Sequence, residues 1–174
     1  MKYASFSILM LFAITSCEKE QIKPTYSTGT TGTATMTVGG RKISFPTKGI
    51  NLRDGKYDLS FWNYILNQQS SLGISFSRLN LNLDRQQVGI YSDVRPYSYM
   101  YTNGGDVTRD EYLLDNEDTT ENYLQFTEIN KEQGKLKGIF RGIYAIDISR
   151  NYLYFDLPDT VIITDGAFDL RTKL

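Results

Sequence analysis

Three tyrosines at alternate positions, Tyr97, Tyr99 and Tyr101, have the type and spacing that suit ligand recognition. In an extended strand, side chains two residues apart point to the same face, so these three rings should lie in a row. Such a row can stack on the apolar faces of sugar rings, although alternating tyrosines also build an ordinary half-exposed strand. Ordinary strand packing is the favoured interpretation, and the three tyrosines are candidate glycan-binding residues as the alternative.

Four carboxylates between Asp115 and Asn122 form the second group that could do chemistry. Asp115, Glu117, Asp118 and Glu121 are spaced as ligands of a hard cation would be, but no glycine within the cluster supplies the sharp turn of an EF-hand. Solvated acidic loops are common, so we expect a loop in water and no metal site.

The composition excludes several kinds of catalysis. The chain has 174 residues and no histidine, which removes Ser-His-Asp and Cys-His mechanisms as well as His-ligated zinc. Nothing among the 20 Asp and Glu residues singles out the pair that glycoside hydrolysis requires. The formal net charge of −1, without a basic block, argues against nucleic acid as a partner. We expect a protein that is not an enzyme and uses no cofactor.

The N-terminus carries the pattern of a lipid anchor. Lys2 precedes an apolar run over residues 5–14, which is too short to span a bilayer. The run ends in Ile14-Thr15-Ser16-Cys17, which resembles a bacterial lipobox, and Cys17 is the chain's sole cysteine. This resemblance implies that residues 1–16 are a lipoprotein signal peptide. It also implies that Cys17 carries diacylglycerol and a further acyl chain such as palmitate.

Between Cys17 and the folded part lies a polar segment rich in Thr and Gly. Residues 17–32 cannot bury apolar area, which predicts a flexible tether followed by a single domain over residues 33–174. Its beginning, Glu18-Lys19-Glu20, partly resembles the charged surface-export signal of Bacteroidota lipoproteins. We expect the domain to be lipid-anchored at the outer membrane, with the cell surface favoured over the periplasmic face.

Short alternating runs separated by turn residues predict an antiparallel all-β domain of about nine to ten strands, either a β-sandwich or barrel-like. Gly39-Gly40 and Gly134 mark two hairpin turns, and we expect another tight turn at Asp165-Gly166. Phe140 and Phe168 should face the core. The runs from which these strands would form are Thr33–Val38, Arg41–Phe45, Tyr57–Leu66, Leu72–Phe76, Leu79–Leu83, Val88–Tyr91, Tyr97–Tyr101, Tyr123–Ile129, Lys135–Ile148, Asn151–Leu157, Val161–Thr164 and Ala167–Leu170.

Three short sequences resemble those of small Bacteroidota lipoproteins that are grouped as domains of unknown function. They are Gly89-Ile90-Tyr91, Gly138-Ile139-Phe140 and a closing Ile163-Thr164-Asp165-Gly166-Ala167-Phe168. In those proteins a threonine usually stands where this chain has Ile139. The resemblance implies a lipid-anchored β domain without an assigned activity, and it carries over no catalytic residue.

Two tripeptides, Asp118-Thr119-Thr120 and Asp159-Thr160-Val161, resemble the Asp-Thr-X sequon of Bacteroidota O-glycosylation. Thr119 and Thr160 are therefore candidate modification sites.

The sequence thus indicates a membrane-anchored, exported accessory or binding domain. The alternatives are a glycan-binding module that uses the tyrosine strand, a small-ligand-binding β-barrel, and an enzyme whose site the sequence does not reveal. Besides the membrane, a glycan or another surface protein is the expected partner. The ligand and the oligomeric state stay open at this point.

Overall fold

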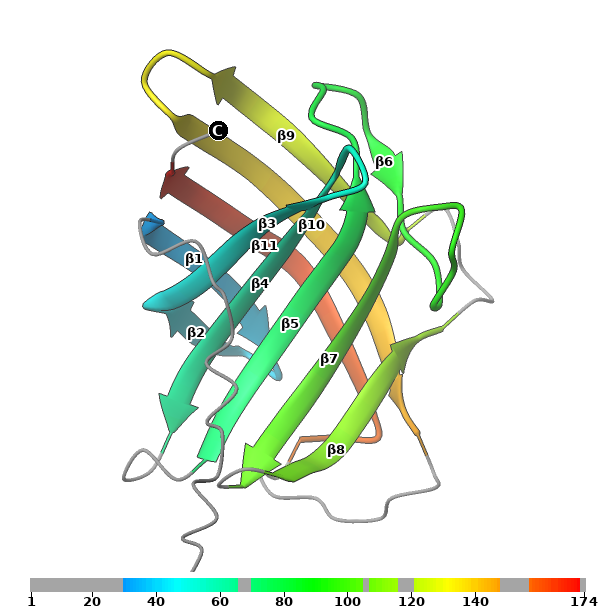
Figure 1. Ribbon diagram of the computed structural model, residues 1–174. Helices are drawn as coiled ribbons and strands as arrows, with labels where there is room; N and C mark the ends of the chain where they lie inside the picture. The colour runs from blue at the N-terminus through cyan, green and yellow to red at the C-terminus, as the bar shows by residue number, and fades with distance from the viewer. Residues whose placement is uncertain (1–29, 66–69, 105–106, 116–120, 148–156, 173–174) are drawn as a thin grey trace, which may run out of the picture.

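The computed structural model of the chain describes residues 30–65, 70–104, 107–115, 121–147 and 157–172, which form strands and no helix (Figure 1). None of these segments contains a helix of the length and apolarity needed to cross a membrane. The strands in chain order are β1 (Thr31–Val38), β2 (Arg41–Phe45), β3 (Thr47–Arg53), β4 (Lys56–Ile65), β5 (Ser70–Leu79), β6 (Gln86–Gln87), β7 (Tyr97–Gly104), β8 (Val107–Leu114), β9 (Tyr123–Asn130), β10 (Lys135–Ile146) and β11 (Thr160–Arg171).

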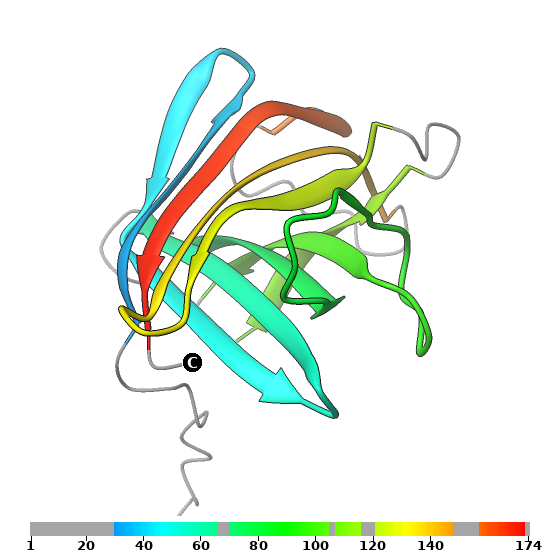
Figure 2. The same cartoon turned by 90° about the horizontal axis from the view of Figure 1, so that it is seen from above.

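The strands form one antiparallel, 11-stranded sheet with the order β2-β1-β11-β10-β8-β7-β5-β4-β3, while β9 pairs with β10 and β6 pairs with β9. Seen from above, the sheet curls so that β1, β10 and β11 face β4 and β5 as two layers (Figure 2). The terminal strands β2 and β3 do not pair with each other, so the sheet is not closed into a barrel. The prediction of an antiparallel, sandwich-like all-β domain is confirmed.

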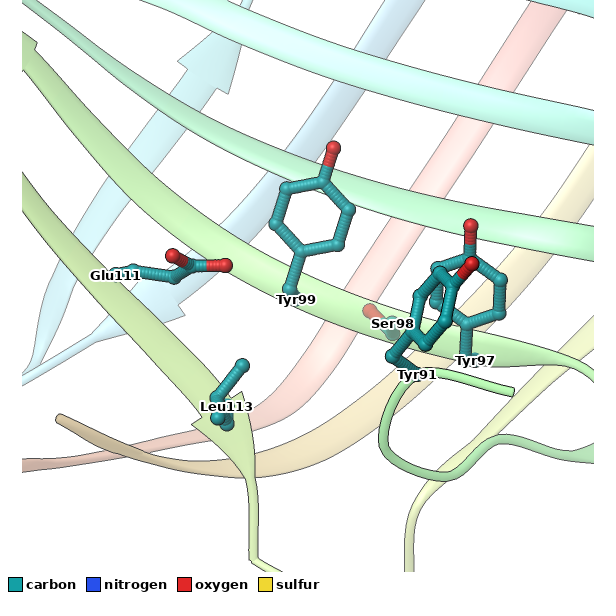
Figure 3. Close-up of a pocket in the computed structure, with 6 residues that line it drawn as sticks. All are labelled: Tyr91, Tyr97, Ser98, Tyr99, Glu111 and Leu113. Atoms are coloured by element: carbon teal, nitrogen blue, oxygen red, sulfur yellow. The ribbon is translucent and has the colours of Figure 1, made fainter. Parts of the chain in front are cut away.

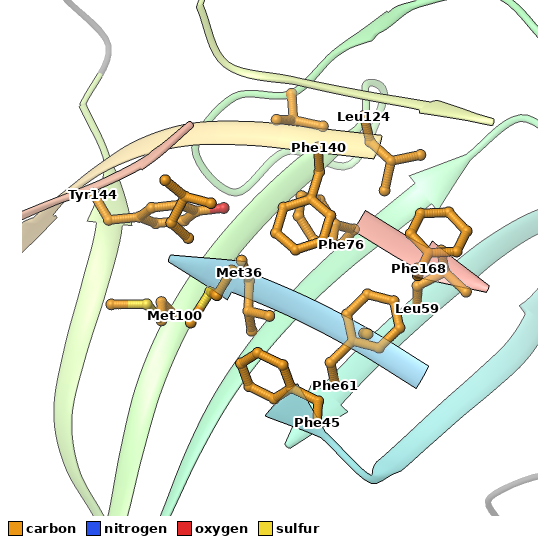
Figure 4. Close-up of a cluster of buried hydrophobic side chains, with 14 of the residues drawn as sticks. Met36, Phe45, Leu59, Phe61, Phe76, Met100, Leu124, Phe140, Tyr144 and Phe168 are labelled. Atoms are coloured by element: carbon orange, nitrogen blue, oxygen red, sulfur yellow. The ribbon is translucent and has the colours of Figure 1, made fainter. Parts of the chain in front are cut away.

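The core lies between the two layers and is rich in aromatic rings (Figure 4). Phe61 of β4 stacks on Phe140 of β10, with 6.1 Å between ring centroids and 12° between ring planes. Phe168 of β11, in the same layer as β10, also contacts Phe61, with 5.7 Å between the ring centroids. These contacts cross from one layer to the other, and the burial of Phe140 and Phe168 confirms that both side chains face the core.

Reciprocal glycine–phenylalanine pairs join β10 to β11. Gly138 lies opposite Phe168, and Gly166 lies opposite Phe140. A Cβ on Gly166 would stand 2.3 Å from the Phe140 ring, and one on Gly138 would stand 2.3 Å from the Phe168 ring. Each ring therefore occupies the space above the glycine of the other strand. This packing gives the two Gly-x-Phe sequences of the closing strands a structural role.

The predicted hairpin turns at Gly39-Gly40 and Gly134 are confirmed. All three glycines adopt positive φ values of 54°, 76° and 61°, which glycine tolerates without strain. Strands β3, β6 and β8 were not foreseen from the sequence. Conversely, the segment expected as a strand over Val88–Tyr91 is a loop that pairs only through a bridge at Gly89. The strand expected over Asn151–Leu157 lies outside the described residues except for Leu157.

The tight turn expected at Asp165-Gly166 is wrong, because β11 runs through both residues. The register shows why the chain need not turn here. Phe140 opposes Gly166 and Gly142 opposes Ile163, so Arg141 on β10 faces two residues of β11. The extra residue makes a β-bulge, which bends the strand, and the backbone pairing of β10 with β11 continues on both sides of it.

A neighbouring strand supplies the hydrogen bonds that hold this bulge. The carboxylate of Asp165 accepts a bond from the Thr37 backbone N–H at 2.9 Å and another from the Thr37 hydroxyl at 2.6 Å. The hydroxyl bond is the largest of the effects that lower the pKa of the Asp165 carboxyl. Residues 128 apart in sequence thus override the local preference of Asp-Gly for a turn.

The strand expected over Leu79–Leu83 is also wrong beyond its first residue, because β5 ends at Leu79. Arg78 adopts a positive φ of 61° within the β-bulge that shifts the register of β5 against β4, and the strand ends one residue later. The Gln86 side chain then satisfies the backbone of Asn80 by accepting from its N–H at 2.7 Å and donating to its carbonyl at 2.8 Å. Leu83 is consequently 56% exposed in the loop.

A buried asparagine fixes the place where β10 changes neighbour from β9 to β8. The Asn122 amide oxygen accepts the N–H of Ile143 at 2.9 Å, and its amide nitrogen donates to the carbonyl of Asp115 at 2.8 Å. The Asn122 carbonyl also accepts the N–H of Val88 at 3.0 Å. Asn122 therefore ties the junction of three strands to the loop that precedes β7.

Candidate functional site

The three candidate tyrosines lie on the outer face of β7, as the alternation predicted. Residues 98, 100 and 102 between and beyond them are buried and face the core, whereas Tyr97, Tyr99 and Tyr101 are half-buried. The Tyr99 and Tyr101 ring centroids are 5.8 Å apart. The rings therefore form a short ladder along the outside of the sheet.

The inner face of β7 is held by a buried hydrogen-bond chain. The Ser98 hydroxyl donates to the Ser75 carbonyl of β5 at 2.7 Å and lies 2.7 Å from the phenol oxygen of Tyr144 on β10. Because the single hydroxyl hydrogen of Ser98 is used on the Ser75 carbonyl, the Tyr144 phenol is the donor to Ser98, and burial raises the pKa of this phenol. This chain links both layers of the domain and fixes the strand that carries the tyrosines.

The three tyrosines differ in how much ring they offer to a ligand. Tyr101 covers Gly73 on β5 so closely that a Cβ there would be 2.2 Å from its ring. Its inner ring face is thus used in packing. Tyr97 contacts Tyr91 with 5.0 Å between centroids and 61° between ring planes. Tyr99 lies between Tyr97 and Tyr101 in sequence. Figure 3 shows its ring apart from the paired rings of Tyr91 and Tyr97.

Strand β8 adds two side chains that sequence reasoning missed. Leu113 pairs with Tyr99 and Glu111 pairs with Tyr101, so both lie beside the ladder on the same outer face. The signal was present in the alternation of Asp110, Tyr112 and Leu114, which are buried, with Glu111 and Leu113. Which strand would carry them beside the tyrosines depended on the pairing of β7 with β8.

A pocket of about 320 Å³ lies at the Tyr97 and Tyr99 end of this row and does not include Tyr101. It is lined by Tyr91, Tyr97, Ser98, Tyr99, Glu111 and Leu113 (Figure 3). The Glu111 carboxylate points toward the Tyr99 ring from one side, and Tyr91 stands on the other side. This volume is at the small end of the range for ligand pockets, about 300–1,000 Å³. Aromatic faces with a carboxylate at the edge suit a ligand that presents both C–H faces and hydroxyl groups.

Of the six lining residues, only Glu111 carries a charge at neutral pH. Tyr91 donates a hydrogen bond from its hydroxyl to the Asp93 carboxylate at 3.1 Å, and this bond is the main reason why the pKa of Tyr91 is raised. The phenol is therefore neutral and available for stacking. The lining offers acceptors and rings to a ligand, and its single formal charge is negative.

Of the other predicted site residues, those that the structure describes do not line this pocket. Cys17 and Thr119 are outside the described residues. Thr160 is exposed at the first position of β11, opposite Ala145. Of the acidic loop, residues 116–120 are outside the described part, and the Glu121 carboxylate pairs with the Arg141 guanidinium at 2.7 Å.

No protein-family model matches the chain, and neither a curated protein sequence nor a solved structure matches it. The resemblance to small Bacteroidota lipoproteins therefore stays a prediction.

Proposed function

We propose that this chain is a lipid-anchored exported protein whose β domain binds a glycan, without catalysis, on the outer face of β7 and β8. The observation that carries the proposal is the pocket in which the rings of Tyr97 and Tyr99 meet the Glu111 carboxylate on an outer sheet face. Half-buried aromatic rings beside a polar acceptor match the amphipathic surface of a sugar, which has C–H faces and hydroxyl edges.

Two observations favour binding over the alternatives. One carboxylate lines the pocket, whereas glycoside hydrolysis employs a pair of acidic groups at a fixed separation. An apolar lumen for a hydrophobic ligand has no support, because rings from the two layers contact each other across the interior, as Phe61 and Phe140 do. A glycan partner at the outer face therefore has the stronger physical basis.

The binding proposal is tested by affinity electrophoresis of the full mature chain, purified in detergent. The gels contain mixed-linkage β-glucan, xylan, galactomannan, dextran or homogalacturonan. We expect at least one polysaccharide to retard the chain, and Tyr99→Ala to weaken binding about tenfold or more, the effect of losing roughly 1.4 kcal/mol of stacking. The matched control is Ile162→Ala, an exposed apolar side chain on β11 outside the pocket. Equal retardation of wild type and Tyr99→Ala would rule out this face as the binding site.

The anchor is tested separately by Cys17→Ser. Two or more acyl chains hold a protein firmly at a bilayer, since each buried methylene contributes about 0.8 kcal/mol. We expect the wild type in the membrane fraction and the variant in the soluble one. The orientation is tested by adding protease to intact cells. Release of the domain while a periplasmic marker survives supports display on the cell surface, and protection of both places the domain in the periplasm.

A further inference from the structure

The loop before β7 forms a rigid wall at one end of the tyrosine ladder. Its two ends are joined at the start of the strand: Gly89 donates its N–H to the Pro96 carbonyl at 3.1 Å, and Ser98 donates to the Gly89 carbonyl at 3.1 Å. One residue earlier, Val88 is buried and bonded to Asn122. The base of the loop is therefore fixed to both β7 and the strand junction.

Hydrogen bonds within the loop fix its tip as well. The Ser92 hydroxyl accepts the N–H groups of Val94 at 3.2 Å and Arg95 at 3.3 Å, which closes a tight turn. The Tyr91 hydroxyl is bonded to Asp93, and its ring stands against the Tyr97 ring at 5.0 Å. Nevertheless the Tyr91 side chain is 70% exposed, so one of its surfaces is free to meet a ligand.

The loop that carries Tyr91 blocks the row of tyrosine rings at its Tyr97 end. Figure 3 shows the Tyr91 ring in front of the Tyr97 ring, and their centroids are 5.0 Å apart. A chain of sugars that follows the ladder from Tyr101 over Tyr99 meets Tyr91 at its end and cannot continue along the strand. The pocket volume of about 320 Å³ at this position is also small for a ligand site, since such sites span about 300–1,000 Å³.

From this geometry we infer that the pocket takes the terminal unit of a glycan chain, with Tyr91 as the residue that excludes internal segments. The inference rests on the proposed glycan binding and adds which part of the chain is recognised. The last sugar stacks against Tyr91 and packs on the ring of Tyr99. Glu111 accepts hydrogen bonds from the hydroxyl groups of this sugar. The number of chain ends then determines binding.

The test compares two chain lengths of each polysaccharide named above, using the full mature chain. One sample is native and the other is shortened by partial acid hydrolysis, at equal mass per volume. If the site takes chain ends, retardation by the shortened sample rises in proportion to its number of ends. If the site takes internal segments, the two samples retard the chain equally, or the shortened one retards it less, and the inference is overturned.

The variant Tyr91→Ala removes the wall. We expect its retardation to depend on polysaccharide mass and no longer on chain ends, because internal segments can now lie across Tyr97 and Tyr99. Val94→Ala is the matched control, since it alters the same loop at a residue that is 88% exposed and does not line the pocket. A Tyr91→Ala variant that keeps the wild-type dependence on chain ends would overturn the role of Tyr91.

The outcomes separate the two proposals. Absence of retardation by every polysaccharide, native and shortened, overturns glycan binding, and the inference about chain ends with it. Retardation that follows mass in the wild type overturns only the inference. Thermal melting of Tyr91→Ala checks its folding, and we expect the wild-type midpoint because the ring is largely exposed.

Discussion

The glycine–phenylalanine pairs between β10 and β11 lead to a quantitative prediction for Gly166→Ala. The new methyl group would begin 2.3 Å from two carbons of the Phe140 ring, far inside van der Waals contact. The ring has little room to retreat, because it is 1% exposed and has Phe61 at 6.1 Å and Phe76 at 5.1 Å. The variant must therefore shift a packed aromatic cluster.

The size of the effect follows from two opposing terms. Overpacking a core costs about 1–3 kcal/mol, whereas replacing glycine in a strand regains about 0.5–1 kcal/mol of backbone entropy. We expect Gly166→Ala to lower the free energy of unfolding by about 1–2 kcal/mol, or the midpoint by roughly 3–8 °C in a domain of this size. Urea titration and thermal melting followed by circular dichroism measure both quantities.

A double-mutant cycle isolates the cause. Phe140→Leu removes the ring from the space above Gly166, so the glycine substitution should cost less in that background than in the wild type. Gly89→Ala is the matched control, because its Cβ would meet the flexible Arg95 side chain at 3.3 Å, which can move aside. If Gly166→Ala melts at or above the wild-type temperature, or shows no coupling to Phe140→Leu, the packing argument is refuted.

Three further predictions concern hydrogen bonds and titration. Asn122→Ala should lower the free energy of unfolding by about 2–4 kcal/mol in urea titration, because loss of the buried Asn122 amide leaves the two backbone groups that it bonds without a partner. Asp165→Asn should be less stable than the wild type at pH 7, and denaturant titration should show the gap closing as pH falls below 3.8. The reason is that the pKa of Asp165 is lowered in the folded state by its bond from the Thr37 hydroxyl, so the carboxylate stabilises the fold only while ionised. Burial raises the pKa of Tyr112 to about 12 and also raises the pKa of Tyr144 above the ordinary value of 10.0. The contribution of these two phenols to the free energy of unfolding should therefore not change with pH below pH 10. It should decline above pH 10, because the phenols ionise in the unfolded chain before they ionise in the folded protein. Unfolding measured together with tyrosinate absorbance checks this, and full ionisation of every tyrosine near pH 10 in the folded protein would contradict it.

Some features of this protein follow from the sequence alone because their causes are local. Glycine at Gly39-Gly40 and Gly134 permits the positive φ of a hairpin turn, and both turns formed where expected. Alternation placed the three tyrosines of β7 on one face and the phenylalanines of the closing strands in the core, since side chains in a strand alternate strictly. The predicted lipid anchor at Cys17 likewise rests on a contiguous pattern and stays a prediction.

Other features were decided by contacts between residues far apart in the chain. Asp165-Gly166 has the local chemistry of a turn, yet Thr37 and the Phe140 ring hold it inside a strand. Glu111 reached the candidate site only because β8 pairs with β7, and Tyr91 only because its loop closes back on Tyr97. Periodicity within a strand reveals which residues share a face, but the neighbour of that face is set by sheet order, and sheet order depends on how the whole core packs.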